Sequence, residues 1–207
     1  PSYNTSIAAA ALAKVNDPKA KDAVAKAAQY LKSIQCGSGA TLPADTVDAP
    51  QLSGLPITLG VVESTQLDDG GNDLITTGTG NDIVVSGFGG DTVGSGDGSD
   101  VVFGDNGSIE YVNAVMAVLQ TTDTVAATGG NDVIDTGNGD IIGFGGVGGD
   151  TVTTGDGSDT VLGDNGVVVD DATGNIALVV SGDPLLGGAD AISTGDGNDL
   201  AMGGTGS

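Results

Sequence analysis

The chain of 207 residues has no histidine and no tryptophan, and only 3% of its residues are aromatic. Without histidine it lacks the commonest general base and the commonest transition-metal ligand. Its single cysteine, Cys36, excludes an intrachain disulfide, and we interpret it as a small apolar side chain. No apolar run approaches the length of about eighteen residues that indicates a membrane span. We therefore expect neither an enzyme nor a membrane-spanning protein.

Positive charge is scarce and confined to one end. All five basic residues lie in the first 32 positions, at Lys14, Lys19, Lys21, Lys26 and Lys32. Of the 28 acidic residues only Asp17 and Asp22 precede Cys36, which leaves 26 after it, and the net charge is -23. Such self-repulsion opposes compaction, so we expect cations from solution to take part in folding. The same composition argues against a nucleic-acid partner.

Glycine is abundant, at 38 residues, and much of it recurs with a period of nine. From Asp68 to Gly107 the sequence reads DDGGNDLIT, TGTGNDIVV, SGFGGDTVG, SGDGSDVVF, GDNG. Each unit predicts a Gly-rich turn and a strand of about three residues with one inward side chain. Stacked units would place their inward Ile and Val side chains in one core between two parallel sheets. The turns would then form a ladder of oxygen ligands for a hard divalent cation.

These units resemble the repeats-in-toxin (RTX, haemolysin-type) calcium-binding nonapeptide G-G-x-G-x-D-x-U-x. The resemblance covers about residues 68–206. It implies a mainly β fold, a right-handed parallel β-roll, which is a solenoid that holds several Ca²⁺ ions in its turns. It also implies that the sixth-position Asp of each unit is a metal ligand. The implied ligands are Asp73, Asp82, Asp91, Asp100, Asp132, Asp150, Asp159, Asp190 and Asp199.

A second, longer period is superimposed on the first. Asp132 follows Asp73 by 59 residues, and Asp190 follows Asp132 by 58 (132 minus 73, and 190 minus 132). Each block holds four repeat strands and one insertion, at about 108–128 and 167–186. We predict that the insertions are β-hairpins, the second turning at 173–175. Because four strands make two layers, both insertions leave on one side, about 9.6 Å apart, and we predict that they pair edge to edge into a side sheet.

Some positions depart from the pattern. Asp140 lies one residue out of phase, so we do not expect regular calcium coordination at that turn. Ile109 stands where a fifth Asp would fall, and Ala201 stands where Ile or Val is expected.

The motif GDNG opens both insertions, at 104–107 and 163–166. Metal sites there must use Asp105 and Asp164, or the returning Asp132 and Asp190.

The chain divides into three parts by composition. Residues 1–36 predict an Ala-rich helical segment, with a second helix restarted by Asp17 and Pro18. The apolar stripe of that helix would either cap the roll or dock on another subunit. Residues 37–50 predict a linker, and residues 51–207 predict the β-roll with its hairpins.

We infer an extracellular calcium-binding structural protein. The resemblance implies secretion, by the type I route, as an unfolded chain that Ca²⁺ folds outside the cell. Open strand edges at both ends of the roll predict a homo-oligomer or polymer, assembled head to tail as a filament, surface layer or adhesin stalk. The alternative is an accessory RTX calcium-binding module of a larger secreted enzyme or toxin. The sequence identifies no cell-surface or host ligand.

Overall fold

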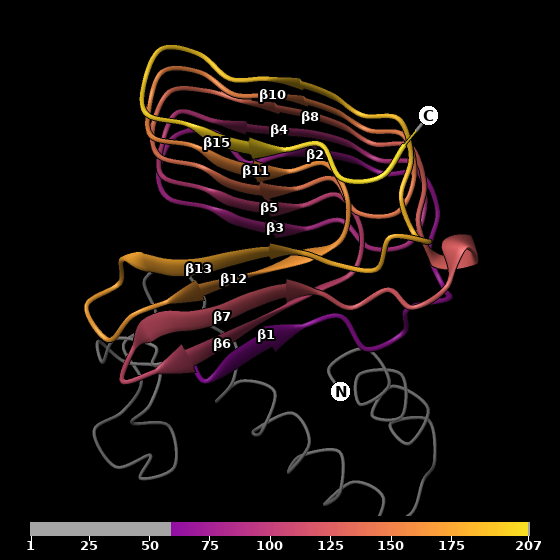
Figure 1. Cartoon of the computed structure of the whole chain (residues 1–207), viewed down its shortest axis with the longest axis horizontal. Coiled ribbons are helices and arrows are strands. Elements are labelled where there is room, and N and C mark those ends of the chain that lie inside the picture. The colour runs from indigo at the N-terminus through magenta and orange to yellow at the C-terminus, as the bar shows by residue number, and fades with distance from the viewer. Residues whose placement is uncertain (1–58, 207) are drawn as a thin grey trace, which may run out of the picture. The chain divides into compact units, whose positions relative to one another are not determined.

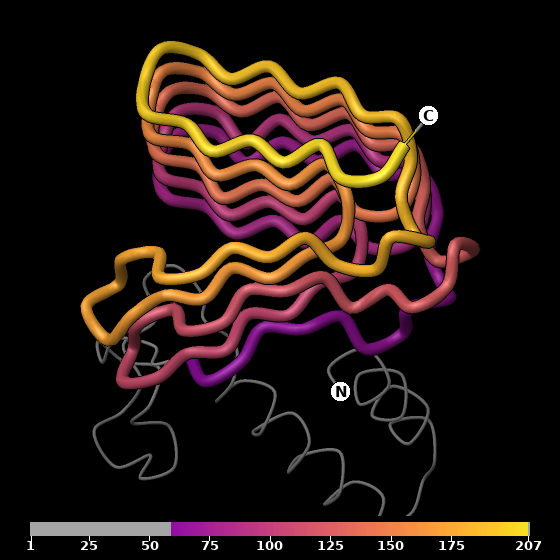
Figure 2. The backbone as a smooth tube through the Cα atoms, in the orientation of Figure 1, coloured from indigo at the N-terminus to yellow at the C-terminus, as the bar shows by residue number. Residues whose placement is uncertain are grey.

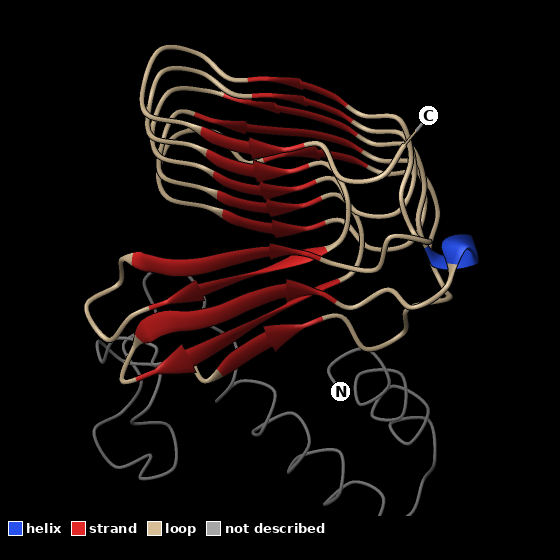
Figure 3. Cartoon of the chain, in the orientation of Figure 1, coloured by secondary structure: helices blue, strands red, loops and turns tan. Residues whose placement is uncertain are grey.

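The structure, a computed structural model, describes residues 59–206. The predicted helical segment at 1–36 and the linker at 37–50 lie outside the described residues. The described part consists of three five-stranded sheets and one 3-10 turn, η1 (Ala126–Thr128) (Figure 3). The prediction of a mainly β protein is confirmed.

Two of the sheets are parallel and contain the repeats. The outer sheet has the strand order β14 (Ala191–Ser193), β10 (Thr151–Thr153), β8 (Val133–Thr136), β4 (Thr92–Gly96), β2 (Leu74–Thr76). The inner sheet has the order β15 (Leu200–Met202), β11 (Thr160–Leu162), β9 (Ile142–Phe144), β5 (Val101–Phe103), β3 (Ile83–Val85). Successive repeat strands alternate between the two sheets, so the ten strands form a stack of five layers (Figure 1).

The first core lies between the outer and inner sheets. The middle residues of neighbouring strands are in register, so Val93 pairs with Ile75 on one side and with Ile134 on the other. The buried members of this core are Val84, Val93, Val102, Ile134, Val152 and Val161. It matches the core that the nine-residue period predicts.

The third sheet, which we call the side sheet, is antiparallel. Its order is β1 (Val61–Glu63), β6 (Gly107–Val112), β7 (Val115–Thr121), β12 (Gly166–Asp170), β13 (Ile176–Ser181). The two hairpins, β6–β7 and β12–β13, join through β7 and β12, where Val168 pairs with Leu119. The predicted edge-to-edge pairing of the hairpins is therefore confirmed. β1 extends the sheet by pairing with β6.

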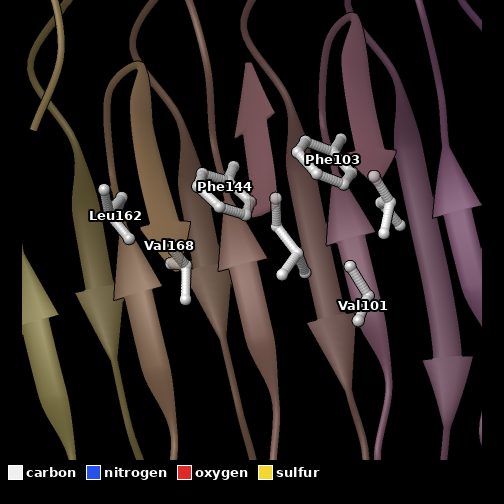
Figure 4. Close-up of a cluster of buried hydrophobic side chains, with 7 residues drawn as sticks. Val101, Phe103, Phe144, Leu162 and Val168 are labelled. Carbon is white, nitrogen blue, oxygen red and sulfur yellow. The ribbon is translucent and has the colours of Figure 1, made fainter. Parts of the chain in front are cut away.

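A second core lies between the inner sheet and the side sheet. Its buried residues are Val101, Phe103, Ile109, Leu119, Phe144, Leu162 and Val168 (Figure 4). Phe103 and Phe144, from neighbouring layers, stack with ring centroids 4.6 Å apart and planes 2° apart. The expectation of one inward side chain per strand is thus wrong for the inner sheet, because the side sheet covers its other face. Ile109, which breaks the Asp phasing, belongs to this second core.

The turns stack in two columns, one at each end of the strands (Figure 2). Gly148 has φ +131°, and a Cβ there would collide with the carbonyl oxygen of Gly130 in the neighbouring turn. Glycine at such positions is required by both backbone conformation and close packing of layers. The β12–β13 turn follows the prediction, with Gly174 at φ +83°. Ala201 pairs with Val161 and is exposed.

Candidate metal centre

The Asp residues at the sixth repeat position fall on two sides of the stack. We call the turns that lead from outer to inner strands the plain side; these are 77–82, 97–100, 137–141, 154–159 and 194–199. We call the turns from inner to outer strands the junction side, because both hairpins interrupt it; these are 86–91, 104–132, 145–150 and 163–190.

On the junction side the ladder of Asp side chains is continuous. In each step one carboxylate oxygen, Oδ1, accepts a hydrogen bond from the backbone N–H of the preceding ladder residue. The four bonds run from Asp73 to Asp91 (2.7 Å), Asp91 to Asp132 (2.7 Å), Asp132 to Asp150 (2.8 Å) and Asp150 to Asp190 (2.9 Å). The ladder therefore passes across both hairpins without a missing step, although Asp91 and Asp132 are 41 residues apart.

On the plain side the ladder is broken once. Asp100 accepts from the N–H of Asp82 at 2.9 Å, and Asp199 accepts from that of Asp159 at 3.1 Å. Between them Ile141, 1% exposed, takes the ladder position; its N–H donates to Asp159 at 3.1 Å, but it has no carboxylate to offer Asp100. Asp140 lies outside the ladder, where its Oδ1 accepts the N–H of Ser158 at 2.8 Å. The nine-residue repeat is therefore not shifted at Asp140. Instead, Ile141 stands at the ladder position where the other repeats have Asp.

The second carboxylate oxygen of most ladder residues is buried without a hydrogen-bond partner. These Oδ2 atoms belong to Asp82, Asp91, Asp100, Asp132, Asp150 and Asp190. Asp159 is an exception, since its Oδ2 accepts the Thr154 hydroxyl at 2.5 Å. Asp73, the first residue of the junction-side ladder, and Asp199, the last residue of the plain-side ladder, are exposed. A buried carboxylate oxygen without a partner is costly, and a bound cation would remove that cost.

Backbone carbonyls share the spaces into which these oxygens point. A Cβ on Gly104 would lie 2.5 Å from Asp132 Oδ2 and would also collide with the carbonyl oxygen of Gly145. A Cβ on Gly145 would lie 2.5 Å from Asp150 Oδ2 and against the carbonyl oxygen of Gly163. Mixed carboxylate and carbonyl oxygens are the ligands that Ca²⁺ prefers. The residues present therefore fit a calcium ion.

The carbonyl groups are an essential part of that fit. Within residues 59–206 no three Cys, Asp or Glu side chains gather closely enough to hold a metal by themselves. The ladder contributes one Asp per turn, and layers are about 4.8 Å apart. Each site must therefore combine a few carboxylates with turn carbonyls, which are placed by the glycine-rich backbone.

Burial raises the pKa values of the junction-side acids. Desolvation, opposed by the ladder hydrogen bonds and reinforced by neighbouring carboxylates, raises the pKa of Asp132 to about 8 and that of Asp150 to about 7. Desolvation is also the main cause of the raised pKa values of Asp91 and Asp190. Without cations these side chains resist ionisation, and a divalent cation would stabilise the ionised form.

The two GDNG motifs hold the bases of the hairpins. Asp105 Oδ2 accepts the N–H of Val147 at 2.6 Å, and desolvation followed by the charge of Asp132 raises the Asp105 pKa to about 9. Asn106 donates to both oxygens of Asp123, from its backbone N–H at 3.1 Å and from its side chain at 3.0 Å. Asp123, whose carboxylate closes the base of the first hairpin, was not predicted, because no repeat phase marks it.

A second set of acceptors was also missed. The residue before the ladder position accepts an N–H from the following layer through its side-chain Oδ1: Asn72 from Gly90 (3.1 Å), Asn81 from Ser99 (3.0 Å) and Asn131 from Gly149 (3.0 Å). The recurring Asn-Asp pair in the sequence was the available signal.

A comparison with family models identifies the repeats. The model of the RTX calcium-binding nonapeptide repeat matches four times, at residues 68–93, 120–140, 143–167 and 186–207. This chain contains RTX repeats. RTX repeats bind several Ca²⁺ ions and imply a β-roll, in agreement with the two parallel sheets and the oxygen-lined turns. Neither the curated proteins nor the solved structures include a match to the chain.

The matched segments leave out most of both hairpins, which begin at β6 and β12. They also leave out β5 and Asp100, so the matches cover most of the stack and its Asp ladders, whereas most of the side sheet lies outside them. Within residues 59–206 no helix has the length and apolar character needed to cross a membrane.

Proposed function

We propose that this RTX-repeat protein is an extracellular structural protein, folded by Ca²⁺ into a right-handed β-roll, whose copies stack head to tail into a filament, surface layer or stalk. The observation that carries the calcium-dependent fold is the Asp ladder with its buried, unpartnered Oδ2 atoms. Residues 59–206 contain no Lys or Arg to neutralise them. A chain of this charge would remain unfolded where calcium is scarce and fold outside the cell, which suits type I secretion.

The strand edges support stacking. Each of the three sheets has five strands, with β1, β2 and β3 at one end of the order and β13, β14 and β15 at the other. Neighbouring strands are about 4.8 Å apart in all three sheets, so five strands give the three sheets the same width. A second copy could therefore add strands to the edges of all three sheets at once. On β13, Ile176, Leu178 and Val180 are 43 to 51% exposed, which adds apolar surface at that end.

The test combines far-UV circular dichroism with light scattering, first in chelator and then in millimolar calcium. The proposal predicts a change from disorder to β-structure, with growth into long particles. Monomers with the same spectral change would favour an accessory module of a larger secreted enzyme or toxin. β-structure already present in chelator would contradict calcium-dependent folding.

A variant at the edge separates folding from stacking. The N–H of Leu200 donates to the Asp159 carbonyl within the stack, so in a parallel ladder the N–H of Ala201 points toward the open edge. Ala201→Pro removes that donor at an exposed position. We expect normal calcium-induced folding and shorter particles, whereas unchanged particle length would show that this edge is not used.

A further inference from the structure

The side sheet has a face turned away from the inner sheet, which we call the distal face. Successive residues of a strand point to opposite faces, so the residues on either side of the buried Val168 lie on the distal face. The register of the five strands arranges the distal residues in two cross-strand rows. One row is Val61, Glu110, Val118, Val169 and Leu178, and the other is Glu63, Ser108, Gln120, Val167 and Val180.

The distal face is apolar where β7, β12 and β13 cross it. Five of the six row positions on these strands are Val or Leu, and the sixth is Gln120. As a result β12 has three consecutive valines, and β13 reads IALVVS. An antiparallel sheet with one face in water alternates apolar and polar residues, whereas continuous apolar strands are typical of sheets covered on both faces.

The outward rows of the outer sheet provide the comparison. They contain four threonines, a serine and an aspartate among ten positions, as expected of a face in water. The rows are Leu74, Thr92, Val133, Thr151 and Ala191, and Thr76, Gly94, Asp135, Thr153 and Ser193. The distal face therefore differs from the solvent face of the same protein.

The residues that the structure describes do not supply a cover. Val61, Leu178 and Val180 on the distal face are 44 to 51% exposed. The three sheets and η1 leave no further element within residues 59–206 that could pack there. The β1–β6 half of the face contains two exposed acids, Glu63 and Glu110. A fitting cover is therefore apolar on one side and carries positive charge beside its apolar surface.

Residues 17–36, which lie outside the described residues, encode such a surface. Their sequence predicts a helix with the apolar stripe Ala20, Val24, Ala27, Leu31 and Ile34 and with lysines on both flanks of it. The apolar part of the distal face spans two strand spacings, about 9.6 Å, which matches the diameter of one helix, about 10 Å. These residues also carry four of the five positive side chains of the chain.

The connection between the two parts favours docking within one chain over pairing of two copies. Residues 37–60 lead directly into β1, an edge strand of the side sheet, and 24 flexible residues span about 27 Å, against a sheet width of about 19 Å. The whole distal face measures only about 400 Å² in projection, whereas a specific interface between separate proteins buries about 800 Å² per partner. A tethered segment needs less area, because its effective concentration is high.

We propose that the distal face is the docking surface for residues 17–36 of the same chain. The segment lies on it as an amphipathic helix, with its apolar stripe on β7, β12 and β13 and the lysines of one flank near Glu63 and Glu110. The docked helix completes a third core and keeps the apolar face out of contact with other copies.

The single cysteine, Cys36, lies two residues beyond the end of the stripe and allows a test on the unmodified sequence. A benzophenone photo-cross-linker is attached to Cys36 of the full chain in millimolar calcium, and mass spectrometry identifies the linked residues. Unlabelled chains are mixed with chains labelled with ¹⁵N. We expect cross-links to the side sheet within one chain. Cross-links mainly to the outer sheet or to the end strands of the stack would overturn the proposal, and links between light and heavy chains would make a second copy the occupant.

Two matched variants test the contact from the side of the sheet. Leu178 on the distal face and Leu74 on the outer sheet are both exposed, so replacing either leaves the two cores intact. We expect Leu178→Asp to lower the yield of Cys36 cross-links to the side sheet severalfold and Leu74→Asp to leave it unchanged. Equal yields in the two variants would overturn the proposal. Neither measurement depends on stacking of copies, so failure of the proposed assembly would not affect the result.

Discussion

The outer and inner sheets are built from the same nine-residue unit, yet they differ in burial. The outer strands contain one core residue each, as in β10, where Val152 is buried between two exposed threonines. The inner strands are apolar at every position except Thr160 of β11, and β5 is buried at all three positions. The difference lies in the residues on either side of the central one.

The cause of the difference is the side sheet. Inner-sheet side chains such as Phe103 and Phe144 point away from the first core and pack on Ile109 and Leu119 of the hairpins. The outer sheet has no such cover among the described residues. All repeats have similar turns, so the two outer residues of each three-residue strand, positions seven and nine of the repeat, decide whether the strand is buried on one face or on both.

Calcium removal should have the largest effect and should separate the two sheets. As calcium is withdrawn in steps, we expect the amide hydrogens of the outer sheet to exchange before those of the inner sheet, because a second core supports only the inner sheet. Hydrogen exchange with mass spectrometry at limiting calcium measures this. Simultaneous exchange of both sheets would show that the stack and side sheet unfold as one unit.

Equivalent positions of the two sheets should differ strongly on truncation. Phe144→Ala, at the last position of an inner strand and 0% exposed, should lower the free energy of unfolding by about 3–5 kcal/mol. Thr153→Ala, at the same position of an outer strand, should change it by less than about 0.5 kcal/mol. Urea unfolding in saturating calcium provides both values. Equal effects would mean that the second core adds little stability.

The two hairpin junctions allow a similar comparison. Asn106 binds Asp123, whereas the side-chain O and N of Asn165, its counterpart, are buried without partners. Asn106→Ala removes the side-chain donor to Asp123 Oδ1, while the backbone N–H still donates to Oδ2, and should cost about 1–3 kcal/mol. Asn165→Ala should cost less than about 0.5 kcal/mol, since it removes no hydrogen bond. Thermal unfolding of both variants in calcium measures the two costs. A larger loss of stability for Asn165→Ala than for Asn106→Ala would show that the Asn106–Asp123 hydrogen bond is not what stabilises the first junction.

The smallest effect concerns a gap in the first core. Gly143 stands where β3, β5 and β11 have Val, and a Cβ there would meet no atom closer than 3.9 Å. Gly143→Ala should raise the free energy of unfolding by about 1 kcal/mol, from reduced backbone entropy and a buried methyl group. Gly94→Ala, in an outer strand with similar space but no core to fill, is the matched control and should gain less. Loss of stability in Gly143→Ala would show that the layers cannot accommodate the methyl group.

Much of the site could be predicted because the ligands are periodic. The nine-residue spacing placed Asp91, Asp132 and Asp150 in one ladder, and the block length placed the two hairpins side by side. Both predictions depend only on counting residues per layer. The exception is Ile141, which occupies a ladder position without a carboxylate. The sequence analysis interpreted it as a shift of Asp140 by one residue, because counting from one Asp to the next does not show which residue lies in the ladder.

The sequence by itself determined the stack, its layers and the side on which the hairpins leave. The reason is that a short repeat with glycine turns can bury its Ile and Val side chains only by stacking on the neighbouring repeats. The tertiary structure alone decided which sheet became doubly buried and how Asp105 differs from Asp164. Those outcomes depend on partners distant in sequence, such as Val147 for Asp105 and Thr205 for Asp164. Identical motifs acquire different chemistry when the neighbouring layer offers different hydrogen-bond donors.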